Sequence, residues 1–69
     1  MPLTLARSGQ PQIIKKITGN DRIRKHLAAL GFVEGGQVTV ISSLQGNLIV
    51  KVKDARIAVD ESLAMRVAV

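Results

Sequence analysis

The stretch from His26 to Ile41, HLAALGFVEGGQVTVI, changes its hydrophobic period in the middle. Before Gly31 the apolar residues have the spacing of a helix, and after Gly36 they alternate as in a strand. Gly31 also stands where a helix C-cap is expected, because glycine enters the left-handed backbone region without a Cβ penalty. The stretch therefore predicts a helix, a glycine corner and a strand in direct succession.

The glycine spacing of this corner is also that of a phosphate-binding loop, GxxxxGK[ST]. Residues 31–38 read GFVEGGQV, so Gln37 and Val38 occupy the positions of the lysine and the hydroxyl residue. The element order is reversed as well, because the phosphate motif lies between a strand and a helix N-terminus. Here a helix C-terminus, with its partial negative charge, precedes the glycines. We interpret them as a corner and not as a phosphate site.

On the N-terminal side of the corner, residues 21–30 are predicted to form the helix. One face carries apolar side chains at helical spacing, namely Ile23, Leu27 and Leu30. Arg24 and Lys25 point to the outer face, and Asn20 or Asp21 is expected to cap the first turn. The helix is therefore amphipathic, with a basic outer surface.

The rest of the chain alternates between short apolar runs and turn residues, which is typical of a small β domain. Strands are predicted at 12–18, 38–44, 48–53, 56–59 and 65–69, with turns at 45–47 and 54–55 and one helical turn at 60–64. The connections are too short for parallel crossovers. The sequence therefore predicts a mainly β, five-stranded antiparallel barrel with one short α-helix after the first strand. Residues 1–69 form one domain, and residues 1–11 are expected to be a loosely ordered lead-in.

The composition predicts an aliphatic core, since 46% of the 69 residues are hydrophobic but the only aromatic residue is one Phe. The residues expected to be buried are Ile14, Ile17, Ile23, Leu27, Leu30, Val38, Val40, Leu48, Val50, Val52, Ile57, Val59 and Val67. There is no cysteine to form disulfides or thiolate metal sites. No run approaches the ~18 apolar residues of a membrane span, and the first residues are too polar for a signal peptide. These features predict a cytoplasmic protein without a membrane span.

Residues for catalysis or metal binding are sparse. His26 is the only histidine, and the carboxylates are scattered along the chain. A metal site usually needs three or four converging ligands, and a nucleophilic hydroxyl needs an oriented base. The sequence therefore predicts no enzymatic activity, no catalytic residues, no metal site and no cofactor.

The net charge of +5 and the pI near 10.5 favour an anionic partner. Small barrels that bind single-stranded nucleic acid use a basic groove with aromatic stacking platforms. This chain offers only Phe32, which reads as a core residue. Non-specific phosphate binding and a simply solvated basic face both remain open at this point.

Three segments, in the right order and covering nearly the whole chain, together resemble the ferrous iron transport protein A family. They are Pro2-Leu3 with Gly9 and KITG at 16–19; Leu27-x-x-Leu30-Gly31-Phe32-Val33-x-Gly35; and Arg56-Ile-Ala-Val59 with Ala64, Val67 and Val69. The chain departs from the family pattern in two turns. Glu34 replaces the usual proline before the second glycine, and Gly46-Asn47-Leu48 replaces a Gly-x-Pro segment.

The resemblance implies an SH3-like barrel that has no catalytic activity and binds no specific nucleic acid. It further implies contact with the cytosolic part of a GTP-binding Fe(II) permease, ferrous iron transport protein B, which would recruit the chain to the inner membrane face and whose transport it would support or regulate. Weak self-association is a further expectation. Two alternatives are kept: a basic nucleic-acid-binding barrel, and an SH3-like interaction module with another client.

A protein that acts by contact needs exposed apolar residues flanked by charge. Strand alternation turns Ile49 outward between polar neighbours, and the helix-to-strand corner is expected to leave Phe32 and Val33 partly exposed. The residues predicted to bind the partner are Arg24, Lys25, Phe32, Val33, Ile49 and Lys51.

Overall fold

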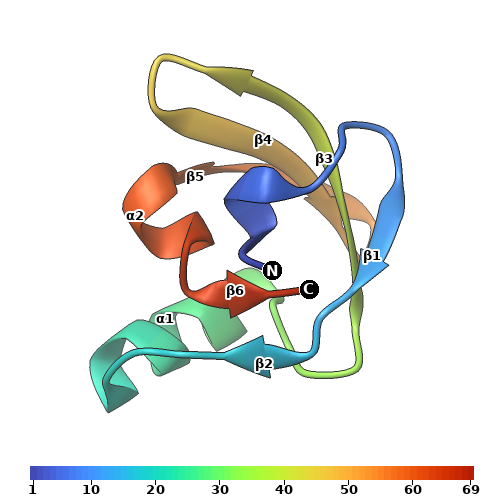
Figure 1. Cartoon of the computed structure of the whole chain (residues 1–69). Coiled ribbons are helices and arrows are strands. Elements are labelled where there is room, and N and C mark those ends of the chain that lie inside the picture. The colour runs from blue at the N-terminus through green and yellow to red at the C-terminus, as the bar shows by residue number, and fades with distance from the viewer.

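The computed structural model describes residues 1–69 and is mainly β (Figure 1). In chain order the elements are the 3₁₀ turn η1 (Leu3–Leu5), β1 (Pro11–Ile13), β2 (Lys16–Ile17), α1 (Asp21–Leu30), β3 (Gln37–Leu44), β4 (Asn47–Val52), β5 (Ala55–Asp60), α2 (Glu61–Ala64) and β6 (Val67–Ala68). The predicted helix at 21–30 and the predicted helical turn near 60–64 are both confirmed.

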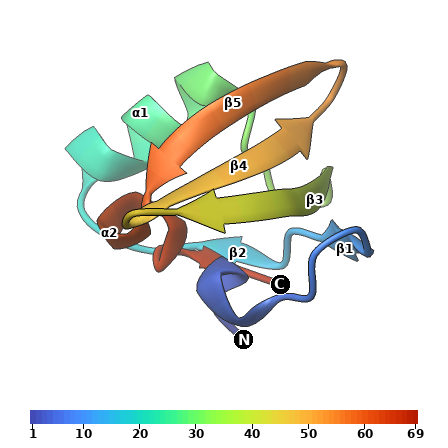
Figure 2. The same ribbon diagram turned by 90° about the horizontal axis from the view of Figure 1, so that it is seen from above.

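The strands form two antiparallel sheets. A four-stranded sheet has the order β1-β3-β4-β5, and a two-stranded sheet pairs β2 with β6 (Figures 1 and 2). The two sheets are not hydrogen-bonded into one closed ring, but together they enclose one core in a barrel-like arrangement. The predicted mainly β fold, with antiparallel strands and a short helix after the first strand segment, is confirmed.

The predicted first strand, residues 12–18, is broken between the two sheets. The backbone N–H of Ile14 donates to the carbonyl of Gly36 at 2.8 Å, whereas the next residue, Lys15, donates to the carbonyl of Ala68 at 2.8 Å. The chain therefore leaves the four-stranded sheet at Ile14 and joins the two-stranded sheet one residue later. This break explains why the isoleucines of the segment do not alternate.

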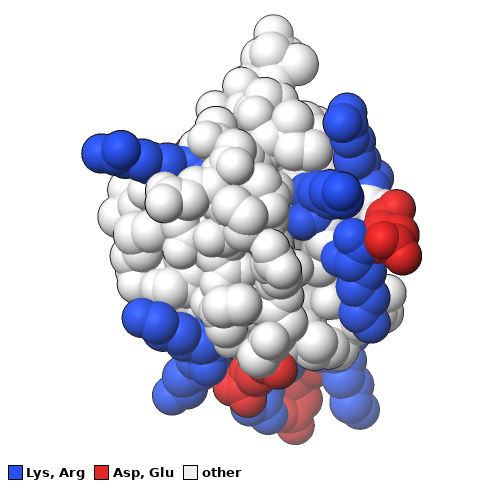
Figure 3. Space-filling view, turned by 90° about the vertical axis from the view of Figure 1, so that its right-hand side faces the viewer, with Lys and Arg blue, Asp and Glu red and all other residues white.

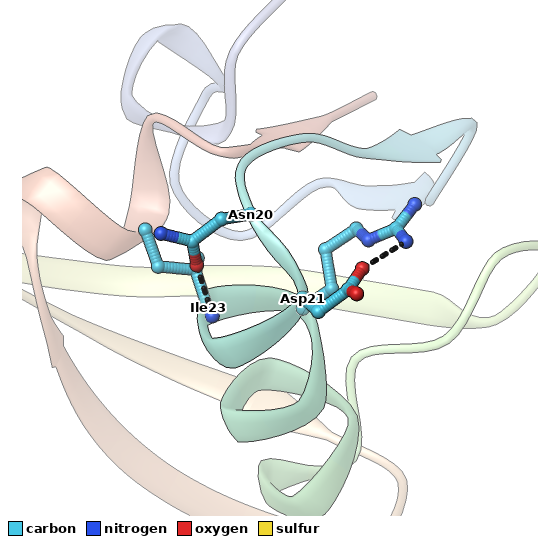
Figure 4. A network of polar contacts seen from close by, with 4 residues as sticks. Asn20, Asp21 and Ile23 are labelled. Carbon is cyan, nitrogen blue, oxygen red and sulfur yellow. Dashed lines mark hydrogen bonds and ion pairs between the residues drawn. The ribbon is translucent and has the colours of Figure 1, made fainter.

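Both ends of α1 are fixed by local interactions. The side-chain Oδ1 of Asn20 accepts from the backbone N–H of Ile23 at 2.9 Å, and Asp21 pairs with Arg24 at 2.8 Å (Figure 4). At the other end Gly31 has φ +108°, and its N–H donates to the carbonyl of Ala28 at 3.0 Å. The predicted N-cap and the predicted glycine C-cap are both confirmed.

Two-residue turns connect the long strands. In the β3–β4 hairpin, Gln45 and Gly46 both have positive φ, +49° and +82°. Positive φ at both central positions is the pattern of a type I′ turn, whose twist matches that of the flanking strands. The β4–β5 turn lies at Lys53 and Asp54, one residue earlier than predicted, and Lys53 has φ +54°.

The core is aliphatic except for Phe32. Its buried members are Leu3, Ile14, Leu27, Phe32, Val38, Val40, Leu48, Val50, Val52, Val59, Ala64, Val67 and Val69. Some residues predicted to be buried are half-buried and pack against this core: Ile17, Ile23, Leu30 and Ile57. The others on the predicted list are buried.

The expectation of a loosely ordered lead-in at residues 1–11 is wrong. Leu3 is completely buried, and the backbone of Pro2 bridges to that of Ala68. The amino group of Met1 donates to the carbonyl of Val69 at 2.8 Å, and the N–H of Val69 donates back at 2.7 Å. The first residues thus lie beside the last ones (Figure 1) and close the core, an arrangement that the polar and proline-containing sequence does not reveal.

Candidate functional site

The histidine and the carboxylates of this chain are all exposed. No three side chains among His, Cys, Asp and Glu come together in a group that could hold a metal ion. His26 is exposed on α1, and no buried polar side chain is left without a partner. No helix has the length and apolarity that a membrane crossing requires. The surface carries two grooves.

One groove lies where β2, α1 and the glycine corner meet, and we call it the corner groove. It has a volume of about 480 Å³ and is lined by Lys16, Ile17, Arg24, Ala28, Phe32, Val33 and Glu34. Three of the residues predicted to bind the partner, Arg24, Phe32 and Val33, thus lie together. Exposed apolar side chains flanked by charges are a common feature of docking surfaces.

The local sequence explains how the corner groove is built. Arg24 and Ala28 are four residues apart on α1, so they lie one above the other on the same helix face. The left-handed conformation of Gly31 ends α1 and turns the chain so that the next residues close the groove. The Arg24–Asp21 pair is exposed, so it orients the guanidinium but adds little stability.

Phe32 and Val33 differ in exposure. Phe32 is only 1% exposed, so the expectation that it is partly exposed is wrong: its side chain is part of the core, although the residue also lines the groove. Val33 is 40% exposed. A single large aromatic ring in an aliphatic core buries more area than any neighbour, which favours its inward position. Val33 is therefore the apolar side chain that a partner would contact first.

A second groove, the sheet-face groove, crosses the outer face of the four-stranded sheet. It has a volume of about 360 Å³ and is lined by Pro11, Gln37, Thr39, Lys51 and Lys53. Ile49 lies on the same face of β4 and is half-buried. Lys51 and Ile49, both predicted to bind the partner, thus lie on a different surface from Arg24 and Val33. Lys25 is exposed on α1 and lines neither groove.

Several groove residues were not identifiable from the sequence. Lys16 and Ile17 reach the corner groove only because the first strand breaks and β2 passes beside α1. Pro11 and Gln37 reach the sheet-face groove through the pairing of β1 with β3. Nothing in the local sequence pattern tells which of Lys15 and Lys16 faces a groove.

The surface charge is mostly basic. Figure 3 shows basic side chains around a broad uncharged area on the side of the molecule that carries β1 and β3. The single ion pair joins Arg24 and Asp21. Most cations therefore have no carboxylate partner within the chain.

Hydrogen bonds from the Ser62 hydroxyl and the Leu63 N–H lower the pKa of Asp60, the N-cap of α2, below its ordinary value.

Comparisons with known proteins point to one family. The FeoA domain model matches residues 1–69. A relative from Methanocaldococcus jannaschii named "Putative Fe(2+) transport protein A" is 32% identical over 68 residues, which cover 99% of this chain and 83% of that protein.

Solved structures agree with this assignment. The crystal structure of an iron uptake regulatory protein, FeoA, superimposes with a TM-score of 0.87 and 32% identity over 96% of this chain and 88% of that one. The FeoA of Stenotrophomonas maltophilia, crystallised with zinc and described as a prokaryotic SH3 domain protein, gives a TM-score of 0.84 and 28% identity over 99% and 87% of the two chains. The predicted SH3-like fold is therefore confirmed, and the chain belongs to the FeoA family.

Proposed function

We propose that this chain is an accessory protein of ferrous iron uptake that acts by contact with the cytosolic part of a GTP-binding Fe(II) permease, ferrous iron transport protein B. Membership of the FeoA family and the likeness to proteins named for Fe(2+) transport support the iron-uptake role. A groove that combines an exposed apolar side chain with charged neighbours supports action by contact. The chain would work in the cytoplasm and be recruited to the inner membrane face by the permease.

The observation that carries this proposal is the corner groove. It joins an exposed apolar residue, Val33, with the cations Arg24 and Lys16 in one concave surface. Docking surfaces typically bury an apolar centre inside a polar rim. The groove therefore offers both an apolar anchor point and charges that orient a partner.

The proposal is tested by the binding of the purified cytosolic domain of the permease to the purified chain. Val33→Asp and Arg24→Glu are expected to weaken binding by about tenfold or more each, because each puts an unfavourable charge into the groove. Both residues are exposed, so the thermal unfolding midpoint should change little.

The chain supplies matched controls. Leu44→Asp makes the same apolar-to-acidic change at a residue that is 65% exposed and lines neither groove. Arg22→Glu makes the same charge reversal on an exposed part of α1 outside the groove. Both controls should bind the permease domain like the parent. Equal losses in the controls, or no binding by the parent chain, would overturn the proposal. Restoration of iron uptake in a deletion strain provides a second readout.

A further inference from the structure

The sheet-face groove lies beside a cluster of basic side chains that has no role in the contact proposed for the corner groove. Lys51 on β4 is paired in register with Arg56 on β5, so two basic side chains lie directly opposite each other on the outer face. Like charges in this position destabilise an antiparallel pair. Lys53 lines the same groove as Lys51 and adds a third cation.

None of these three cations is neutralised within the chain. The only ion pair of the structure is between Arg24 and Asp21, both on α1. Asp54 lies in the neighbouring turn, but it makes no ion pair with them. The mutual repulsion of Lys51 and Arg56 therefore persists in the isolated chain.

The backbone of Lys53, in the β4–β5 turn, has an unfavourable conformation as well. Lys53 has φ +54°, in the left-handed region that residues with a Cβ rarely occupy. Glycine or asparagine would fit this turn position better. Gln45 adopts a similar φ of +49° in the other hairpin turn, so the conformation belongs to the turn, and what matters for the groove is that the turn brings the cation of Lys53 beside Lys51.

We infer that the sheet-face groove binds an extended acidic segment of another protein. Carboxylates inserted between Lys51, Lys53 and Arg56 would relieve the repulsion that the chain itself leaves uncompensated. Ile49 lies on the same face beside this basic row and offers an apolar contact to the neighbouring side chains of such a segment. This inference stands whether or not the permease is the partner.

The observations favour a protein segment over other polyanions. The groove is concave and is lined by Pro11, Gln37 and Thr39 as well as by the lysines, a shape and polarity that suit an extended peptide segment. Base stacking needs exposed aromatic rings, and the only aromatic side chain, Phe32, is buried. Carboxylates need only the charge and shape that are present.

The test uses a fluorescein-labelled oligoglutamate peptide and the full chain, with binding followed by fluorescence anisotropy at low and at physiological salt. Lys51→Glu is expected to weaken binding by about tenfold or more, because it removes one cation and pairs with Arg56. Arg22→Glu changes the net charge equally away from both grooves and should weaken binding by less than about threefold.

The stability of the Lys51→Glu variant provides a second readout. If Lys51 had only a structural role, this substitution would lower the thermal unfolding midpoint. Lys51→Glu creates a cross-strand ion pair, so its thermal unfolding midpoint should equal or exceed that of the parent while its affinity falls. Lys51→Gln removes the cation without reversing the charge, and it too should weaken oligoglutamate binding without lowering the unfolding midpoint. Equal losses in Lys51→Glu and Arg22→Glu, or no oligoglutamate binding by the parent at low salt, would overturn the inference. Tighter binding of oligo(dT) or of phosphatidylglycerol vesicles than of oligoglutamate, lost in Lys51→Glu, would also overturn it.

Discussion

The backbone N–H of Ile14 donates to the carbonyl of Gly36 at 2.8 Å, which ties the end of β1 to the glycine corner. The N–H of Gly35 donates in turn to the carbonyl of Ile14 at 2.8 Å. Gly35 has φ +84°, and no atom lies within 4 Å of where its Cβ would be, so backbone conformation and not crowding favours glycine there. The glycine cluster thus joins the helix, the strand break and the four-stranded sheet.

Gly31→Val is expected to destabilise the chain by more than about 1 kcal/mol. Valine at φ +108° is strained, because β-branched residues avoid the left-handed region. The Cβ position itself is not crowded, because the nearest atom, Val52 Cγ1, lies at an ordinary contact distance of 3.5 Å, so backbone strain is the expected cause. Urea unfolding measures the loss, with Ala29→Val at an exposed helix position as the control. If both variants lost the same stability, the C-cap would not be the cause.

The helix and its ends could be predicted because their determinants are local. The spacing of Ile23, Leu27 and Leu30, the capping side chain of Asn20 and the glycine after the last turn all lie within twelve residues. The type and order of the longer strands followed from alternation in the same way.

The closure of the barrel and the grooves could not be predicted, because they depend on residues far apart in the chain. Leu3 is buried only because β6 returns to the first residues, and the local sequence around it reads as a loop. Strand alternation correctly gave the outer face to Lys51, but only the pairing of β4 with β5 places Arg56 opposite it. Chain closure depends on contacts between distant residues, and the β4–β5 register depends on the exact turn position, which was predicted one residue too late.

Leu3→Ala tests the structural role of the first residues. Leu3 is completely buried, so its truncation should cost about 2–4 kcal/mol through lost burial and a cavity. Leu5→Ala removes the same atoms from a side chain that is 68% exposed and should change the free energy of unfolding by less than about 0.5 kcal/mol. Denaturant unfolding compares the two. Similar small losses would mean that the segment is not packed as described.

Asp60 should make the stability of the chain depend on pH in the acid range. Its pKa is lowered by the Ser62 hydroxyl and then by the Leu63 N–H, so its folded pKa lies below its unfolded value. A group of this kind stabilises above the unfolded pKa, and the stabilisation is lost as the pH falls through the folded pKa.

Asp60→Asn is the matched variant, because asparagine can still cap α2 but does not titrate. The difference in unfolding midpoint between the parent and Asp60→Asn should be constant from neutral pH to about pH 5 and should shrink below about pH 4. A difference that stayed constant down to about pH 2 would show that the carboxylate charge contributes nothing at this position.

Lys53→Gly is expected to stabilise the chain by about 0.5–1 kcal/mol, because glycine adopts φ +54° without strain. The control variant Ala55→Gly introduces glycine two positions later. It should destabilise the chain by a similar amount, since Ala55 begins β5 with ordinary backbone geometry. Urea unfolding of the two variants should therefore give changes of opposite sign.

Because Lys53→Gly also removes a cation from the sheet-face groove, it should bind oligoglutamate more weakly than the parent while unfolding at a higher urea concentration. Loss of stability in both variants would show that Lys53 is not strained in its turn, and unchanged affinity would remove it from the acidic-segment site.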